Sequence, residues 1–336
     1  MSDRRLKASP LSVAPMMAWT DRHCRVFHRE LSSRVLLYTE MVTSAALIRG
    51  GARPLLAFSA QEHPVALQLG GEDPVELAKA AKLAEEEGYD EVNLNVGCPS
   101  DRVQSGTFGA VLMKRPHHVA QCVSEMQAAV SIPVTVKCRL GVDDQVPEET
   151  LPVFLRALAD AGTQQVTIHA RKAWLKGLSP KENRDVPPLD YDLVARMAKA
   201  FPELSIALNG GLETLAAAKT AFDLGLDGAM IGRAAYHRPF DLLANADRQF
   251  YGATLPPKAR AEVLAGMEPY IADHLQGGGQ LHQITRHMLG LFAGQPGARA
   301  WRRILSERGT GAGAGLDVLS DAYAAVTAET DAQTAA

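Results

Sequence analysis

The sequence lacks the features that place a protein in a membrane or direct it out of the cell. Its 336 residues contain no run of 18 or more apolar residues, so no membrane-spanning helix is predicted. The first residues, Met1 to Arg5, carry no apolar segment of the kind found in secretory signals. We therefore expect a cytoplasmic protein with no membrane partner.

Cysteine is also scarce, and its spacing is irregular. The four cysteines stand at positions 24, 98, 122 and 138, and no two of them form a Cys-x-x-Cys pair. This spacing argues against a structural zinc site and against a disulfide framework. We expect four reduced thiols and no bound metal.

What the sequence does contain is a regular alternation of short apolar runs and helical segments. Between residues 11 and 233, an apolar run, a polar or glycine-rich corner and a helical segment follow one another eight times. Eight such units in roughly 230 residues predict an α/β fold of the TIM (β/α)8 barrel type rather than an open sheet. The strands are expected at residues 11–14, 35–39, 65–69, 91–96, 134–138, 165–170, 205–209 and 228–231.

After residue 250 the pattern becomes purely helical. Helices are expected over residues 259–276, 281–292 and 298–308, and Gly277-Gly278-Gly279 separates the first two. We therefore expect three parts. They are a barrel domain over residues 1–250, a small all-helical domain over 251–316 and a flexible tail over 317–336.

Polar residues follow the expected strands. Barrel enzymes build their active sites at the carboxyl ends of the strands, and so many polar groups converging there are hard to explain as core. In chain order these residues are Pro15-Met16-Met17, Glu40, Gln68, Asn95 with Cys98, Lys137 with Arg139, His169 with Arg171, Asn209-Gly210-Gly211, and Gly232-Arg233.

The fourth strand end displays a thiol. Asn93 and Asn95 share one face of the strand, and Gly97 is expected to give the corner a backbone conformation that other residues rarely adopt. A lone cysteine is more often a small apolar core residue than a reactive one. Cys98, however, lies at the rim where the other polar groups converge, and this favours a chemical role.

Glycines and basic residues predict anionic ligands. Gly210-Gly211 and Gly232-Arg233 follow the last two strands, where barrels often bind phosphate through open backbone N–H groups. Although the net charge is −3, residues 281–308 contain five arginines and one glutamate. The long segment 172–188 is also basic and includes a tryptophan. These local charges favour a polyanionic partner.

Several strings of the sequence resemble those of the tRNA-dihydrouridine synthases. They are Ala14-Pro-Met-Met17, Gln68-Leu-Gly-Gly71, Asn93-Leu-Asn-Val-Gly-Cys-Pro99, Val136-Lys-Cys-Arg-Leu-Gly141, Ile168-His-Ala-Arg171, Asn209-Gly-Gly211 and Ile231-Gly-Arg233. The segments 171–184 and 284–303 resemble the A subfamily in particular.

The resemblance implies a barrel that binds FMN, takes electrons from NADPH and reduces uridines 20 and 20a of the tRNA D-loop to 5,6-dihydrouridine. It also implies that the helical domain binds tRNA, that no obligate protein partner is needed, and that Cys98 donates a proton. The flavin-binding residues it implies are Pro15, Met16, Met17, Gln68, Lys137, His169, Asn209, Gly210, Gly211, Gly232 and Arg233. For the substrate and the tRNA we expect Asn95, Arg139, Arg171, Lys181, Arg184, Arg299 and Arg302.

The expected chemistry suits these residues. Reduction of the C5–C6 bond needs a hydride at C6 and a proton at C5, and a thiol with an ordinary pKa is mostly protonated at neutral pH. Two other functions fit part of the pattern. An FMN oxidoreductase of free pyrimidines, of the dihydroorotate or dihydropyrimidine type, would explain the barrel but not the basic segments. A non-catalytic tRNA-binding module that merely retains a barrel would explain the basic segments.

Overall fold

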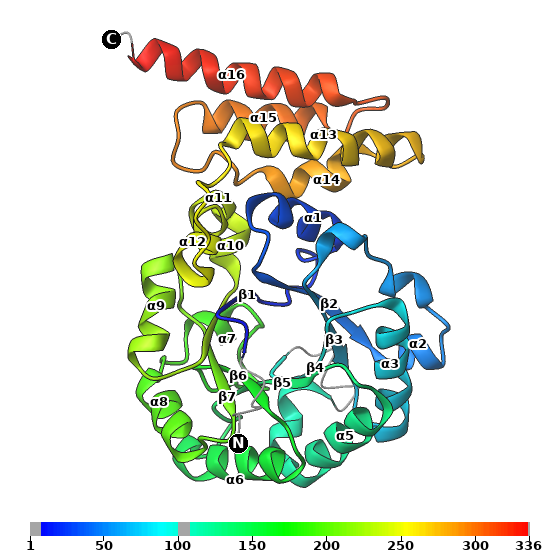
Figure 1. The fold of residues 1–336 in the computed structure, drawn as a ribbon, viewed down its shortest axis with the longest axis vertical. Coiled ribbons are helices and arrows are strands. Elements are labelled where there is room, and N and C mark those ends of the chain that lie inside the picture. Colours follow the sequence, from blue (N-terminus) through cyan, green and yellow to red (C-terminus); the bar gives the residue numbers. More distant parts are fainter. Residues whose placement is uncertain (1–7, 100–107, 335–336) are drawn as a thin grey trace. The chain divides into compact units, whose positions relative to one another are not determined.

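The computed structural model divides the chain into two compact units and describes residues 8–99 and 108–334 (Figure 1). The first unit is built from Met1–Met17 and Leu36–Gly232, and the second from Ala18–Val35 and Arg233–Ala336. Among the described residues, no helix is both long enough and apolar enough to cross a lipid bilayer.

The first unit is a closed barrel of parallel strands (Figure 1). Each strand pairs with its neighbours in chain order, and the last strand pairs with the first. The predicted TIM-type barrel is confirmed, and three strands have the predicted bounds. The strands are β1 (Leu11–Val13), β2 (Leu36–Thr43), β3 (Val65–Gly70), β4 (Glu91–Val96), β5 (Val134–Arg139), β6 (Gln165–His169), β7 (Ser205–Asn209) and β8 (Gly228–Ile231).

β2 is longer than its sequence pattern indicated. The expected strand ended at residue 39, whereas β2 continues to Thr43 after a register shift between Tyr38 and Met41. A register shift disturbs the period-two alternation of side chains on which the sequence prediction rests. The pattern therefore ended before the strand did.

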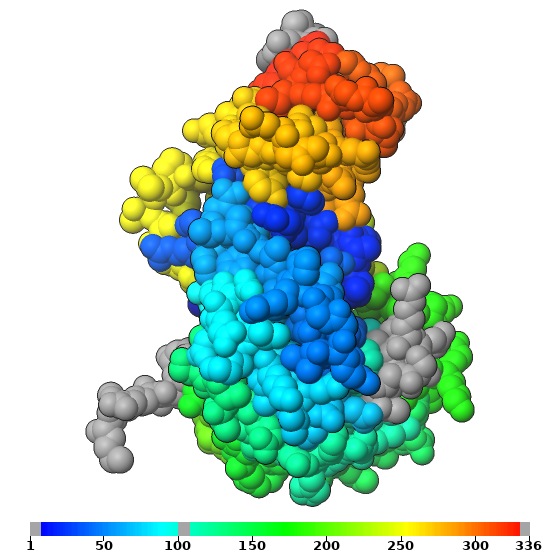
Figure 2. All heavy atoms as spheres, turned by 90° about the vertical axis from the view of Figure 1, so that its right-hand side faces the viewer, coloured from blue at the N-terminus to red at the C-terminus, as the bar shows by residue number. Residues whose placement is uncertain are grey.

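Helices cover the outside of the barrel. In α3 (Pro74–Glu87), Asp73 caps the first turn, Gly88 ends the helix in the left-handed region, and the apolar stripe is buried. Figure 2 shows one side of this wall, where the light-blue to cyan part of the chain faces the viewer. The other helices of this unit are α2 (Ser44–Ile48), η1 (Arg53–Leu56), η2 (Ala60–Glu62), η3 (Gly109–Lys114), α5 (Pro116–Ala129), α6 (Pro147–Asp160), α7 (Glu182–Asp185), α8 (Tyr191–Ala200) and α9 (Leu215–Asp223).

The second unit is helical throughout its described residues. It begins earlier than the sequence indicated, because the contacts group residues 18–35 and 233–250 with the C-terminal helices rather than with the barrel. Its helices are α1 (Arg22–Leu31), α10 (Arg233–His237), α11 (Pro239–Leu243), α12 (Ala246–Tyr251), α13 (Arg260–Gln276), α14 (Leu281–Met288), α15 (Ala298–Arg308) and α16 (Leu316–Thr334).

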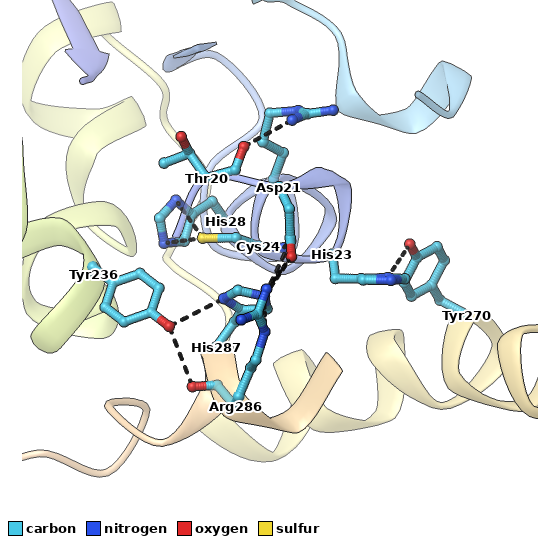
Figure 3. Close-up of polar contacts among 10 residues, drawn as sticks. Thr20, Asp21, His23, Cys24, His28, Tyr236, Tyr270, Arg286 and His287 are labelled. Carbon is cyan, nitrogen blue, oxygen red and sulfur yellow. Dashed lines mark hydrogen bonds and ion pairs between the residues drawn. The ribbon is translucent and has the colours of Figure 1, made fainter. Parts of the chain in front are cut away.

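A polar cluster explains why α1, which lies between β1 and β2 in the chain, belongs to the helical unit (Figure 3). Asp21 caps α1 and also forms ion pairs with Arg286 and His287 of α14. Burial would raise the pKa of Asp21, but His287, the Cys24 N–H and Arg286 outweigh it and hold the pKa well below its usual range. Asp21 is thus an ionised link between the two helices.

The segment predicted as a flexible tail is mostly helical. In α16, Val318, Leu319, Ala322 and Val326 are buried, and the helix packs against α15 and α13. The abundance of alanine and threonine hid this short apolar stripe from the sequence analysis. Residues 335 and 336 of the predicted tail lie outside the described part of the chain.

Candidate active site

The thiol of Cys98 is held at the end of β4 by three backbone hydrogen bonds. Asn95 Oδ1 accepts from the N–H groups of Gly97 (3.0 Å) and Cys98 (2.9 Å), and the Cys98 carbonyl accepts from Ala110 N–H (2.9 Å). Cys98 is half-buried, whereas the other three cysteines are buried. The predicted rim position of this thiol therefore agrees with the fold.

The corner is not made by an unusual glycine conformation, contrary to our expectation. Gly97 is absent from the residues with positive φ, and a side-chain Cβ at this position would make only ordinary contacts, the nearest at 3.4 Å. The amide of Asn95 shapes the turn instead. Its Oδ1, which we expected to meet the substrate, already accepts the two backbone N–H groups.

Cationic residues gather at the ends of β5 and β6. Burial, reinforced by the charge of Arg139, lowers the pKa of Lys137 to about 7. Burial also lowers the pKa of Arg139 to about 10. The pKa of His169 lies well below its usual value, because of burial first and then the charges of Arg139, Lys137, Arg171 and Arg184. Five predicted residues therefore share one electrostatic environment.

Arg139 connects the thiol corner with the long segment after β6. Its Nε donates to the Gly97 carbonyl (3.1 Å), and its Nη1 donates to the Asn183 carbonyl (2.7 Å). The side chain is buried within the barrel unit. We expected Arg139 to contact the substrate or the tRNA, and in this structure its guanidinium holds two loops together.

Asn183 is the organising residue of segment 172–188, and the sequence analysis missed it. Its Oδ1 accepts from Trp174 N–H (2.7 Å), and its Nδ2 donates to the carbonyls of Trp174 (2.9 Å) and Leu178 (3.1 Å). Around it, Lys181 and Arg184 are exposed. One signal was available, since Ser179-Pro-Lys-Glu182 is a capping-box pattern, and these two residues do form its reciprocal hydrogen bonds in the turn that leads into α7.

Asn209 joins three strands at the rim. Its Oδ1 accepts from Lys137 Nζ (2.9 Å), and its Nδ2 donates to the Met230 carbonyl of β8 (2.7 Å). Gly210 follows with φ +102°, and a Cβ there would lie 3.1 Å from the His169 ring, so only glycine fits. The predicted cluster of Lys137, His169, Asn209 and Gly210 is therefore brought together.

At the rim, the carboxyl ends of β1 and β8 lie next to each other. A Cβ built on Gly232 would have Ala14 Cβ and Met16 Sδ as its nearest atoms, at 3.9 and 4.0 Å. The first and last strands thus bring Met16 and Gly232 together, as predicted. Pro15 is half-buried and Met17 exposed beside them in the chain, and Arg233 follows as the first residue of α10.

Two buried side-chain nitrogens at this rim have no hydrogen-bond partner among the described residues. They are His169 Nδ1 and Arg171 Nε, although Arg171 Nη1 donates to the Pro187 carbonyl. Buried polar groups are almost always paired. Together with the left-handed Gly210 and Gly211 and the nearby cations, they fit a polar ligand that carries negative charge.

The predicted arginines of the second unit differ in how they are paired. Arg286 pairs with Asp21, Arg303 with Glu307, and Arg308 with Asp321 and Asp317. Arg299 and Arg302 are exposed on α15, and neither has a carboxylate partner within residues 8–99 and 108–334. These two charges remain available to an anion outside the chain.

A closed parallel barrel with a thiol, amides and cations at the carboxyl ends of its strands defines a barrel enzyme. The particular family follows from comparison. The chain belongs to the dihydrouridine synthase family, whose sequence profile matches residues 12–327. The family predicted from the sequence is confirmed.

Individual relatives are similar over nearly their whole length. The chain is 56% identical to the tRNA-dihydrouridine(20/20a) synthase of Vibrio cholerae over 317 residues, which cover 94% of this chain and 96% of that one. For the enzyme of the same name from Escherichia coli K12 the identity is 55%, covering 93% and 90% of the two chains. For that of Synechocystis it is 53%, covering 94% of both.

Solved structures share the fold at much lower identity. An old yellow enzyme homologue from Zymomonas mobilis superimposes with a TM-score of 0.51 at 13% identity, covering 76% of this chain and 92% of that one. Morphinone reductase gives 0.51 at 12% identity, covering 76% and 88%. These similarities establish the barrel fold.

Proposed function

We propose that this protein reduces uridine in tRNA to 5,6-dihydrouridine, using FMN and NADPH, at the D-loop positions 20 and 20a that its relatives' names give. One observation carries the proposal. A chain of this family holds a half-buried thiol beside a cluster of buried cations at the rim of its barrel. A proton donor and a site for an anionic ligand are therefore adjacent.

The residues at the rim fit FMN. Gln68, Lys137 and His169 would hold its ring and ribityl chain, with Pro15 to Met17 beside them. Gly210, Gly211, Gly232 and Arg233 would hold its phosphate, because glycines let backbone N–H groups approach an anion. When bound and reduced, FMN supplies the hydride for uracil C6. The unpaired His169 Nδ1 and Arg171 Nε support a polar occupant.

The protein's own groups account for the remaining steps. Cys98 donates its proton to C5, because the charge that develops on the pyrimidine must be quenched there. Asn95 and Ala110 fix the backbone on both sides of the thiol. Lys137 provides a cation whose pKa is tuned by burial, and His169 remains neutral at pH 7.

The exposed arginines favour tRNA over a free pyrimidine. Arg299 and Arg302 have no carboxylate partners in the described chain, and a small neutral base would make no use of them. Segment 172–188 adds exposed Lys181 and Arg184. A non-catalytic tRNA-binding module, in turn, would not need a thiol beside tuned cations.

The experiment combines substrate choice with one substitution. Purified protein with NADPH should form dihydrouridine in unmodified tRNA and leave uracil and orotate unreduced, and flavin should be released on denaturation. Cys98→Ala should retain its flavin and its NADPH oxidation by an artificial acceptor, while dihydrouridine formation falls by about 10²- to 10⁴-fold.

Cys138→Ala is the matched control, since it removes a buried thiol from the neighbouring strand β5. It should leave dihydrouridine formation close to that of the unaltered protein. Unchanged turnover in Cys98→Ala would refute the proton-donor role. Reduction of orotate but not of tRNA would refute the proposed substrate.

A further inference from the structure

A single chain of hydrogen bonds crosses the interior of the barrel beneath the thiol corner. Asn95 Nδ2 donates to Gln68 Oε1, Gln68 Nε2 donates to Asn93 Oδ1, and Asn93 Nδ2 donates to Thr135 Oγ1, each at 2.8 Å. Thr135 Oγ1 in turn donates to Glu91 Oε1 at 2.6 Å. All five side chains are buried, and they come from the adjacent strands β3, β4 and β5.

Every donor in this chain points toward Glu91. At the far end, Tyr38 also donates its hydroxyl to Glu91 Oε1, at 2.5 Å. Because two hydroxyls donate to the same oxygen, Oε1 is an acceptor, and a proton on the carboxyl would have to be carried by Oε2. Thr135 uses its single hydroxyl hydrogen to donate to Glu91, so only the lone pairs of its oxygen are left to face Asn93.

The direction then propagates toward the thiol. Thr135 accepts, so Asn93 must present its NH2 group to Thr135 and its oxygen to Gln68. Gln68 must therefore present its oxygen to Asn95. This leaves Asn95 Oδ1 free to accept the N–H groups of Gly97 and Cys98. Turning any one amide over would place two donors or two acceptors face to face.

We propose that Glu91, Thr135 and Asn93 are positioning residues, which orient the Asn95 amide and thereby hold Cys98 for proton transfer. The inference rests on the proposed function, because it assigns the purpose of the chain to the Cys98 thiol. The chain does not end at solvent or at another strand. It ends at the two backbone N–H groups that define the corner carrying the thiol.

The decisive variants are Thr135→Val and Thr135→Ser. Valine has nearly the shape of threonine but breaks the chain between Asn93 and Glu91, whereas serine keeps the hydroxyl. Thr167→Val is the matched control. Thr167 is a buried threonine on β6, beside β5 in the barrel, and it takes no part in the chain.

Two measurements report on the thiol. The first is the rate of Cys98 alkylation by iodoacetamide across pH, measured by mass spectrometry on the whole protein. It reports on Cys98 because the other three cysteines are buried. The second is dihydrouridine formation at saturating and subsaturating tRNA. Melting temperature and flavin content are measured in parallel.

Thr135→Val should shift the pH profile of Cys98 alkylation and lower kcat for dihydrouridine by about tenfold, with KM for tRNA unchanged, because misplacement of a reacting group acts on the chemical step. Thr135→Ser should restore both. Thr167→Val should affect the melting temperature alone. If Thr135→Val is not obtained folded, Asn93→Leu breaks the same chain and should give the same two changes.

A Thr135→Val protein that behaves like Thr167→Val, losing stability but keeping the alkylation profile and kcat, would overturn the inference. The outcome is separable from that of the proposed function. If the unaltered protein forms no dihydrouridine, the proposed function fails, and the alkylation profiles still decide whether the chain positions the thiol.

Discussion

Lys137 is a lysine whose pKa is lowered into the neutral range. It lies at the end of β5, and its ammonium donates to Asn209 Oδ1 rather than to a carboxylate. Burial lowers its pKa from 10.5 to about 7, and the neighbouring Arg139 charge contributes in the same direction. A bound anion would restore the charged form, so this lysine suits a site that receives a negatively charged group.

The depressed pKa of Lys137 predicts how stability depends on pH. Between about pH 7 and pH 10.5 the unfolded chain keeps a proton that the folded chain has lost, so Lys137 makes the free energy of unfolding increase as the pH rises through this window. Below pH 7 both states are protonated and the cost of the buried charge is fully present. Urea unfolding of the flavin-free protein from pH 6.5 to 9.5 should show this rise, and Lys137→Met should flatten it.

The comparison of variant with unaltered protein isolates Lys137 from other groups that titrate in the same window, such as Arg139. Lys199→Met, at an exposed lysine of α8, serves as control and should keep the slope of the unaltered protein. If Lys137→Met and Lys199→Met give the same pH profile, Lys137 is charged in the folded protein throughout the window.

For individual residues, the sequence predicted which side chains meet at the rim better than it predicted what those side chains do there. Cys98, Lys137, His169 and Asn209 could be found because each is a polar residue near or just after the carboxyl end of an apolar strand. Hydrogen-bond partners depend on side chains from other strands, which a local pattern does not contain. The Asn95 amide, for example, is oriented by Gln68 of β3, so it caps the corner, whereas we expected it to face the substrate.

Among the elements, segment 172–188 owes its shape to one buried side chain. Asn183 is fully buried, and its side-chain amide bonds four backbone groups of the same segment. Its backbone carbonyl accepts from Arg139. The strands could be predicted since their apolar runs are local. The shape of this loop could not be predicted, because Asn183 of α7 bonds residues up to nine positions earlier in the chain and also Arg139 of β5.

Asn183→Ala should loosen segment 172–188 without disturbing the barrel. The substitution leaves backbone groups of Trp174 and Leu178 unpaired, which costs about 1–3 kcal/mol per buried group. We expect faster proteolytic cleavage within 172–188 and a several-fold higher KM for tRNA. NADPH oxidation by an artificial acceptor should be little changed.

Ser179→Ala is the control within the same segment. It removes the exposed hydroxyl that accepts from the Glu182 N–H at the start of α7 and leaves the Asn183 amide in place. Because exposed caps contribute about 1 kcal/mol, its effect on cleavage should be much smaller. Equal cleavage of both variants would mean that the α7 cap, and not Asn183, orders the segment.

For the whole molecule, the distribution of charge matters more than its sum. The net charge is −3, and the ion pairs of α14, α15 and α16 neutralise three of the five arginines between residues 281 and 308. The sequence count alone could not separate paired from unpaired arginines, since Arg286 and Arg308 find partners in α1 and α16. The structure reduces the candidate tRNA contacts there to Arg299 and Arg302.

The double variant Arg299→Ala, Arg302→Ala tests this reduction. Both side chains are exposed on α15, so their loss should leave the fold and the oxidation of NADPH by an artificial acceptor intact. Each phosphate contact contributes roughly 0.7–0.9 to the slope of log K against log salt, so the slope should flatten by roughly 1 to 2. Binding to unmodified tRNA, measured by fluorescence anisotropy from 50 to 300 mM salt, gives the slope directly. Arg196→Ala with Lys199→Ala is the matched control, because it removes the same charge at the same three-residue spacing from α8. If tRNA responds to net charge only, the two double variants would show equal slopes. A slope that flattens more in the α15 variant than in the α8 variant locates the contact on α15.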